Sequence, residues 1–162
     1  MGKMMNIQIR PATKEDLSAI LAMIREFAEY EELSQYCEVT EERLKVGLFG
    51  EKAVAEAIIA LENNGPVGYA VFYPNFLTFR GQRGLFLEDI YLKPEIRGRS
   101  LGEKMLRYIA CLAKSRGFER IDFLVLAWNE PAIGFYKKLG AVVDESERHF
   151  KFTYQAFQKL AS

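Results

Sequence analysis

Apolar residues recur along the chain with two different spacings, which predict strands and helices in alternation. Over residues 6–10, Ile7 and Ile9 alternate with polar neighbours, as expected for a short strand. After Thr13 the apolar positions follow each other every three or four residues, at Leu17, Ile20, Leu21, Ile24, Phe27 and Ala28. This spacing is typical of an amphipathic helix with one buried face, and Thr13 and Asp16 approximate a capping box at its start.

Turn and capping residues divide the rest of the chain into further elements. Asn63-Asn64-Gly65 separates two apolar segments and predicts a hairpin, because Asn-Gly supplies the positive φ that tight turns need. The first arm of this hairpin is also compatible with a helix on propensity. The predicted strands cover residues 53–61, 66–73, 84–92, 120–126, 142–143 and 150–153. The predicted helices cover residues 40–49, 101–116, 129–139 and 154–160.

The order of these elements predicts an α/β fold built as one domain over residues 1–162. We expect a mixed, mostly antiparallel sheet with helices on both faces. A length of 162 residues suits one domain, and 49% hydrophobic with 13% aromatic residues is enough for a proper core.

Charge and cysteine content exclude several classes of function. The 22 basic residues balance the 22 acidic ones, so the basic field of a duplex nucleic-acid binder is absent. Apolar runs are far shorter than the roughly 20 residues that cross a bilayer, and residues 1–6 lack a signal-peptide core, so we expect no membrane partner and a cytoplasmic location. Cys37, Cys111 and His149 form no metal-ligand pattern, so we expect no metal.

The most informative segment is the small-residue turn over residues 97–102, which follows a predicted strand and opens a predicted helix. Such a turn leaves backbone N–H groups aimed at one point, where the helix dipole also favours an anion. Five cations lie nearby in sequence, against Glu95 and Glu103: Lys93, Arg97, Arg99, Lys104 and Arg107. The turn therefore predicts a phosphate site, although glycines that merely reverse the chain give the same pattern.

This segment resembles the acetyl-CoA loop of the GNAT superfamily of N-acetyltransferases, which reads Arg or Gln, two residues, Gly, one residue, Gly or Ala. Arg97, Ser100 and Gly102 occupy those positions, so serine replaces the middle glycine. If that position needs positive φ, Ser100 is strained by about 1 kcal/mol. If it needs only a small residue, the hydroxyl supplies an additional hydrogen bond to phosphate.

Nearly the whole chain resembles the diamine (spermidine/spermine and thialysine) branch of that superfamily. The matching motifs are Arg10-Pro11-Ala12-Thr13, Tyr30-Glu31, Leu87-Glu88-Asp89, Trp128-Asn129-Glu130-Pro131 and Phe135-Tyr136-Lys137. The resemblance implies a homodimer with acetyl-CoA as co-substrate. It implies cofactor contacts at Ile90, Tyr91, Leu92, Arg97, Gly98, Arg99, Ser100, Leu101, Gly102, Glu103 and Asn129. It also implies that Tyr136 is the general acid, while Asn129 has an alternative role as a helix N-cap.

Elementary acid–base chemistry gives Glu88 and Tyr136 their proposed tasks. An alkylammonium has a pKa near 10.4, so presenting the neutral amine at pH 7 costs about 4.6 kcal/mol and calls for a proton acceptor. Glu88 lies mid-strand among apolar residues, where partial burial would raise its pKa toward that of a useful base. A solvent-facing Glu88 and a core-packed Tyr136 are the structural alternatives.

An acidic stretch points to the nature of the amine. Between residues 26 and 42 there are seven acids and no Lys or Arg: Glu26, Glu29, Glu31, Glu32, Glu38, Glu41 and Glu42. Such a stretch attracts a polyvalent amine, although many acidic faces are only solvated. By resemblance Tyr30, Glu31 and Glu88 contact the substrate, and Glu32 could replace Glu31 by position.

We therefore predict an N-acetyltransferase that moves acetyl from acetyl-CoA to a primary amine of a small di- or polyamine or thialysine. The alternatives are an acetyltransferase for an amino acid, an aminoglycoside, a protein lysine or a protein N-terminus, and a weakly catalytic acyl-CoA sensor.

Overall fold

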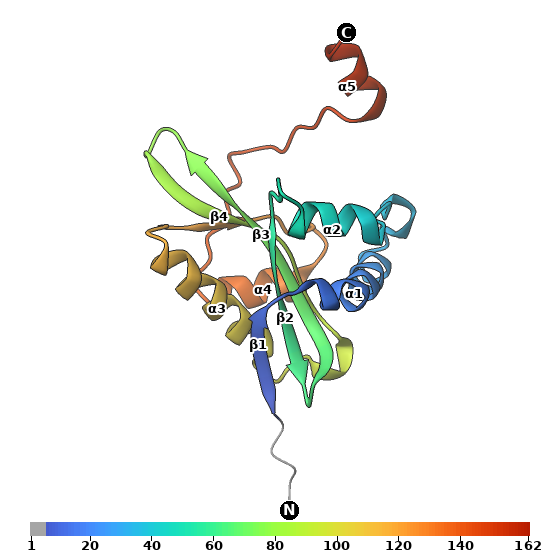
Figure 1. The fold of residues 1–162 in the computed structure, drawn as a ribbon. Coiled ribbons are helices and arrows are strands. Elements are labelled where there is room, and N and C mark those ends of the chain that lie inside the picture. The colour runs from blue at the N-terminus through green and yellow to red at the C-terminus, as the bar shows by residue number, and fades with distance from the viewer. Residues whose placement is uncertain (1–5) are drawn as a thin grey trace, which may run out of the picture. The chain divides into compact units, whose positions relative to one another are not determined.

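The computed structural model describes residues 6–162 and contains two compact units, Met1–Leu124 and Val125–Ser162. The first unit holds the sheet and most of the helices, and the second holds two short helices (Figure 1). The expectation that residues 1–162 form one domain stays a prediction.

A five-stranded sheet is the frame of the first unit. It consists of β1 (Ile7–Pro11), β2 (Glu56–Glu62), β3 (Gly65–Leu77), β4 (Gln82–Leu92) and β5 (Ile121–Phe123), in that spatial order. The strands from β1 to β4 pair antiparallel, and β5 runs parallel to β4. This confirms the predicted mixed, mostly antiparallel sheet.

Helices cover both faces of this sheet, as the sequence predicts (Figure 1). The helical elements of the unit are η1 (Lys14–Asp16), α1 (Leu17–Tyr30), η2 (Ser34–Tyr36), α2 (Glu41–Phe49), η3 (Pro94–Ile96) and α3 (Leu101–Ser115). Because side chains alternate along a strand, β2 sends Ile58 and Ala60 to one face and Ile59 to the other.

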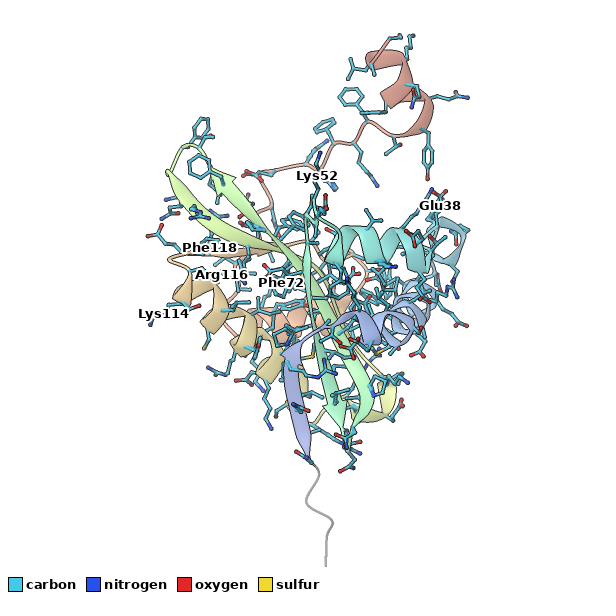
Figure 2. All side chains as sticks on the ribbon, in the orientation of Figure 1. Glu38, Lys52, Phe72, Lys114, Arg116 and Phe118 are labelled. Carbon is cyan, nitrogen blue, oxygen red and sulfur yellow. The ribbon has the colours of Figure 1, made fainter. Side chains whose placement is uncertain are left out.

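Each face carries its own apolar cluster. The first packs Met105 and Ile109 of α3 against the sheet. Phe72 and Phe118 belong to the same cluster (Figure 2). The second packs α1, through buried residues such as Ile20, against the opposite face. The two clusters hold α1 and α3 against the sheet. They thereby also position the end of α1 and the start of α3.

The hairpin between β2 and β3 forms where the sequence places it, but not with the residue expected to make the turn. Asn63 and Asn64 adopt the positive φ values, 49° and 67°, whereas Gly65 already belongs to β3. Asparagine tolerates the left-handed region because its side chain hydrogen-bonds locally. The strand interpretation of the first arm is correct, and the strand begins at Glu56 rather than residue 53.

The second unit contains α4 (Glu130–Lys138) and α5 (Tyr154–Leu160), both at predicted positions. The strands predicted at residues 142–143 and 150–153 are wrong, because no ladder forms there within residues 6–162. Val142 and Phe150 are 93% and 86% exposed, so their β propensity has no neighbouring strand to pack on. The strand predicted over residues 120–126 is likewise shorter, at Ile121–Phe123.

Candidate active site

Strand β4 contains a bulge at Glu88, and this bulge arranges the acidic residues of the first unit. Val71 pairs with Asp89 while the next residue, Phe72, pairs with Leu87, so Glu88 is the extra residue. An extra residue reverses the alternation of side chains along a strand. Leu85 and Leu87 belong to the cluster under α3, whereas Tyr91 belongs to the cluster under α1.

Asp89 therefore lies on the same side as Tyr69, whose phenol donates a 3.1 Å hydrogen bond to Asp89 Oδ2. Burial raises the pKa of Asp89 to about 6, although the bond from Tyr69 opposes that rise by stabilising the carboxylate. Burial and the nearby Asp89 carboxylate also raise the pKa of the Tyr69 phenol. Tyr69 thus stays protonated and remains a donor.

Glu31 follows the last residue of α1 and lies near Asp89. Burial raises the pKa of Glu31, and the negative charge of Asp89 raises it further. Two partly buried carboxylates that repel each other bind a cation favourably, because the cation offsets both their repulsion and the free-energy cost of their burial. Glu32, the positional alternative, is exposed and has a φ of 58°.

Glu88 itself is exposed, which corrects the expectation that this carboxylate is partly buried. Its Oε2 accepts a 3.3 Å hydrogen bond from the phenol of Tyr73, whose ring stacks on Phe86. The bulge explains the difference, because a bulged residue leaves the regular register and projects away from the packed face. The carboxylate that lies on the packed α1 side of the sheet is that of its neighbour, Asp89.

The predicted anion loop has the backbone geometry that its sequence indicates. Gly98 and Ser100 both have positive φ, 79° and 59°, and Ser100 is the N-cap residue of α3. The loop is anchored by Ile96 and Leu101, which are each 2% exposed. The position of Ser100 therefore does need positive φ, so the strain expected for serine applies, and its side chain makes no capping bond to the helix.

The cations near this loop are partly occupied by other groups. Arg99 Nη1 lies 3.0 Å from Glu62 Oε1, and Arg107 pairs with Glu103 at 2.7 Å. The guanidinium of Arg97 packs over the ring of Tyr30 at 4.6 Å, and its Nε donates to the Leu92 carbonyl over 3.0 Å. The basic character of the loop is therefore smaller than the five cations in sequence indicate.

The remaining predicted site residues belong to the second unit, with Asn129 directly before α4 and Tyr136 within it. Asn129 is buried, and its side-chain oxygen accepts a 3.3 Å hydrogen bond from the Ala132 N–H, which confirms its N-cap role. Tyr136 is half-buried, and its ring lies edge-on to Phe135 at 5.2 Å.

Comparison with known proteins decides the family. Residues 17–141 match the family model described as Acetyltransferase (GNAT) family. The chain belongs to the GNAT acetyltransferase family. It is an acetyl-CoA-dependent N-acetyltransferase, as the sequence predicts.

Similar proteins cover almost the whole length of this GNAT chain. Thialysine N-epsilon-acetyltransferase of Bos taurus is 39% identical over 166 positions, which cover 96% of this chain and 97% of that protein. The protein of the same name in Caenorhabditis elegans is 31% identical and covers 92% of each chain. An integron cassette protein from the mobile metagenome of V.cholerae has the same fold, with a TM-score of 0.81, 21% identity, and 96% and 97% coverage of the two chains.

The edge of β4 and the loop after it fit the co-substrate that GNAT acetyltransferases use, acetyl-CoA. Pairing with β5 involves only Leu85–Leu87 of β4, so Ile90, Tyr91 and Leu92 extend beyond that ladder. The open space beside Gly98 and the N-terminus of the 15-residue α3 suit a pyrophosphate. Tyr91 and Leu101 are buried, so their side chains are not available to a ligand.

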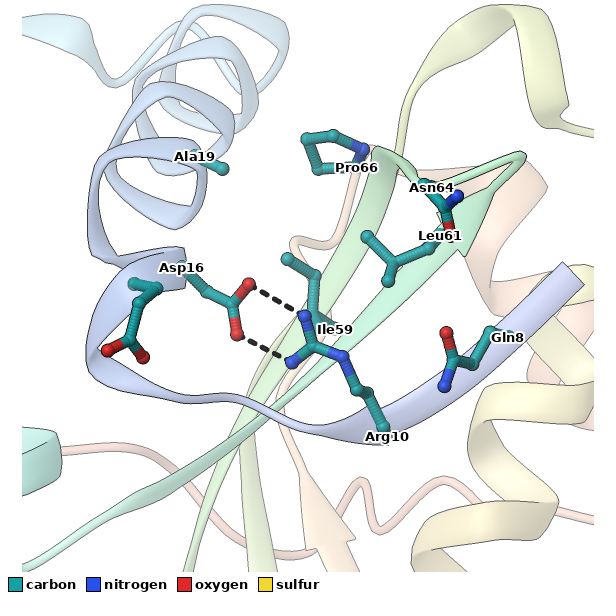
Figure 3. A pocket seen from close by; sticks show the side chains of 9 residues that line it. Gln8, Arg10, Asp16, Ala19, Ile59, Leu61, Asn64 and Pro66 are labelled. Carbon is teal, nitrogen blue, oxygen red and sulfur yellow. Dashed lines mark hydrogen bonds and ion pairs between the residues drawn. The ribbon is translucent and has the colours of Figure 1, made fainter.

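The Arg10-Pro11-Ala12-Thr13 motif has a structural task in this GNAT chain. Arg10 Nη1 and Nη2 donate to Asp16 Oδ2 and Oδ1 over 2.7 and 3.0 Å, on the wall of a pocket between β1 and α1 (Figure 3). Asp16 Oδ2 also accepts from the Thr13 N–H, which completes the predicted capping box. The charges of Arg10 and Asp16 therefore satisfy each other, and Glu15 adds a second carboxylate to the pocket lining.

Within residues 6–162, no group of His, Cys, Asp and Glu side chains is arranged to hold a metal ion. None of the helices in the same range is both long and apolar enough to cross a membrane.

Proposed function

We propose that this acetyltransferase modifies a primary amine of a small di- or polyamine or a thialysine-like molecule. The observation that carries the proposal is the carboxylate pair of Glu31 and Asp89. Burial raises the pKa of both groups, and the negative charge of Asp89 raises that of Glu31 further. A bound second ammonium group would relieve this repulsion. Tyr30 and Glu31 at the end of α1 are the proposed contacts to this distal group, and the names of the relatives support the same class of substrate.

In this proposal Glu88 removes the proton of the reacting amine through a water molecule. Its exposure gives water access to the carboxylate, and the hydrogen bond from Tyr73 holds the side chain in one orientation. Deprotonation of an ordinary alkylammonium at pH 7 costs about 4.6 kcal/mol, which a positioned base offsets. Backbone N–H groups in the Ile90–Leu92 region are suited to stabilise negative charge that develops on an acyl oxygen.

Tyr136 is the proposed general acid. Acetyl-CoA supplies an acetyl thioester, on which the amine forms the C–N bond as the C–S bond breaks. A phenol with a pKa near 10 donates to a thiolate whose conjugate acid lies near 8.5, an uphill step of about 2 kcal/mol. Support for Tyr136 comes from the match of the motifs around residues 128–137.

The proposed acetyl-CoA contacts are those implied by the family resemblance. They are the backbone of Ile90, Tyr91 and Leu92, the loop residues Arg97, Gly98, Arg99, Ser100, Leu101, Gly102 and Glu103, and Asn129. The engagement of Arg99 and Glu103 in ion pairs makes their backbone groups the better candidates.

A homodimer in the cytoplasm is the proposed state of the enzyme, with no metal in the reaction. Phe76 and Phe79 are 61% and 105% exposed near the turn between β3 and β4, and such aromatics favour an interface. Cys37 and Cys111 are free thiols, which fits a reducing compartment.

A screen that measures thiol release from acetyl-CoA tests the function. We expect turnover with thialysine and polyamines to exceed turnover with amino acids, aminoglycosides, and peptides that present a lysine or an N-terminus. Preference for one of those other amines would overturn the substrate class. Binding of CoA without thiol release for any amine would favour the sensor alternative.

A further inference from the structure

Tyr30 contacts the loop proposed for acetyl-CoA, although it lies at the end of the helix proposed for the amine. The guanidinium of Arg97 lies 4.6 Å from the centre of the Tyr30 ring and 5.6 Å from that of Tyr91. Its Nε also donates to the Leu92 carbonyl over 3.0 Å. The first residue of the loop is thus held between α1 and the end of β4, and Tyr30 supplies the shorter of its two aromatic contacts.

The turn after α1 connects Tyr30 rigidly to Glu31. The Leu33 N–H donates to the Ala28 carbonyl over 2.8 Å, and the Glu32 N–H donates to the Glu29 carbonyl over 3.0 Å. Glu32 has a φ of 58°, so these residues form a Schellman motif with a left-handed residue after the helix. A displacement of Tyr30 would therefore also displace the Glu31 carboxylate relative to Asp89.

A second contact fixes the same end of α1 to β4. The phenol of Tyr91 donates to Glu26 Oε2 over 3.1 Å, and its ring lies 5.4 Å from that of Phe27. Burial and, after it, the hydrogen bond to Glu26 raise the pKa of Tyr91 to about 12, so the phenol remains a donor at neutral pH. Tyr91 immediately precedes Leu92, whose carbonyl accepts the hydrogen bond from Arg97. The end of α1, the end of β4 and the start of the loop are therefore packed together.

We propose that Tyr30 is a positioning residue for Arg97 and that it couples the binding of acetyl-CoA to the binding of the amine. The proposal rests on the function proposed above. Stacking on Tyr30 keeps the planar guanidinium in one orientation, with its outer N–H groups available to an anion. An amine held at Glu31 orders the end of α1 and, with it, Tyr30, so Arg97 is already positioned when the pyrophosphate arrives.

The size and symmetry of the effect follow from general physical chemistry. A cation–π contact at a partly exposed site corresponds to roughly a two- to five-fold change in affinity. Coupling between two ligands is reciprocal, so CoA must strengthen binding of the amine by the same factor. A general structural defect in a Tyr30 variant would weaken the binding of CoA, of the amine or of both. It would not remove the coupling between the two.

The test measures binding of CoA by calorimetry, with and without saturating thialysine, because CoA carries no acetyl group and the ternary complex cannot react. In the wild type we expect thialysine to tighten CoA binding roughly two- to five-fold. Tyr30→Leu should weaken CoA binding by a similar factor. In this variant the ratio of the CoA dissociation constants measured without and with thialysine should be one. Tyr30→Phe retains the ring and should retain the ratio.

Two further variants separate positioning from a general defect. Arg97→Lys keeps the charge but loses the planar group, so it should also remove the coupling between CoA and thialysine. In the double variant, adding Tyr30→Leu to Arg97→Lys should have no further effect on this coupling. Tyr36→Leu, at an exposed tyrosine a few residues further along, should leave the ratio unchanged.

Unchanged or tighter CoA binding in Tyr30→Leu would overturn the inference while leaving the proposed function intact. A wild-type ratio of one would overturn it as well. Absence of thiol release by the wild type with thialysine would instead count against the proposed function.

Discussion

The Tyr69 phenol donates a hydrogen bond to Asp89 Oδ2 over 3.1 Å, and the bulge at Glu88 makes this contact possible. Without the extra residue, Asp89 would point to the same face as Leu87, into the cluster under α3. With it, the carboxylate joins Tyr69 on the α1 side, close enough to Glu31 for their charges to interact. The carboxylate pair of Glu31 and Asp89 is thus a consequence of one inserted residue in β4.

Replacement of Asp89 by Asn should stabilise the fold at neutral pH, because it removes a buried charge and keeps an acceptor for Tyr69. The pKa of Asp89 is about 6 when folded, against 3.8 as its ordinary value. Between these values the folded state holds the proton that the unfolded state has lost, so wild-type stability should fall as pH rises from about 4 to 6, by roughly 2 to 3 kcal/mol.

Urea unfolding of both proteins from pH 4 to 8 measures this difference. Asp89→Leu should be less stable than Asp89→Asn at every pH, because the Tyr69 phenol then lacks its acceptor. If the free energies of unfolding of the wild type and Asp89→Asn differ by the same amount over this whole pH range, the assigned pKa is contradicted.

The ion pair between Arg10 and Asp16 should contribute mainly to stability. Hydrogen bonds from Arg10 and Thr13 hold the pKa of Asp16 below its ordinary value. Asp16→Ala should therefore cost about 2 kcal/mol at pH 7. This loss should shrink as the pH falls below about 4, because the unfolded wild type binds a proton at Asp16 there, whereas the folded state binds it only at lower pH. Thermal unfolding at pH 7 and pH 3 provides the measurement. An equal loss at both values would show that the carboxylate charge is not involved.

Two substitutions at Ser100 separate backbone strain from a hydroxyl contact. Ser100→Gly relieves the positive φ, and Ser100→Ala keeps the strain but removes the hydroxyl. If the hydroxyl binds phosphate, both variants should bind CoA more weakly, by a factor of roughly 10 or more, as expected for one hydrogen bond to a charged group. Equal CoA affinity in wild type and Ser100→Ala, measured by calorimetry, would assign the serine no role in binding.

The proposed acid and base should respond differently to pH. Tyr136→Phe keeps the ring beside Phe135 and should lower kcat roughly 10² to 10⁴-fold with little change in CoA affinity. Glu88→Gln should recover activity as pH rises, because the free amine becomes more abundant. Profiles of kcat against pH, measured from pH 6 to 10 with a stopped assay, distinguish the two variants. Near-full turnover by folded, CoA-binding Tyr136→Phe would return Tyr136 to a packing role.

Much of the fold follows from local pattern. The amphipathic spacing in α1 and α3 and the capping residues Thr40 and Asn129 place helices close to their observed bounds. The strand signal at residues 150–153 fails because a strand needs a partner, which composition alone does not reveal.

The site is only partly readable from sequence. The anion loop is predictable because Gly98, Ser100 and the start of α3 are contiguous. The sequence interpretation missed Asp89, since strict alternation does not show where a bulge falls. It also missed the contact between Tyr30 and Arg97, which join through tertiary packing. An acidic pair in mid-strand, Glu88-Asp89, was the one available signal.

The most direct test compares kcat/KM for putrescine and butylamine, which share a four-carbon chain and differ in the second amine. The wild type should prefer putrescine, and Glu31→Gln should reduce that preference by roughly ten-fold or more, the value of a hydrogen bond to a charged group. Glu32→Gln, at the exposed neighbour, should keep it. A preference unchanged in Glu31→Gln, or a wild type that acetylates both amines equally well, would contradict selection of a diamine by Glu31 and Asp89.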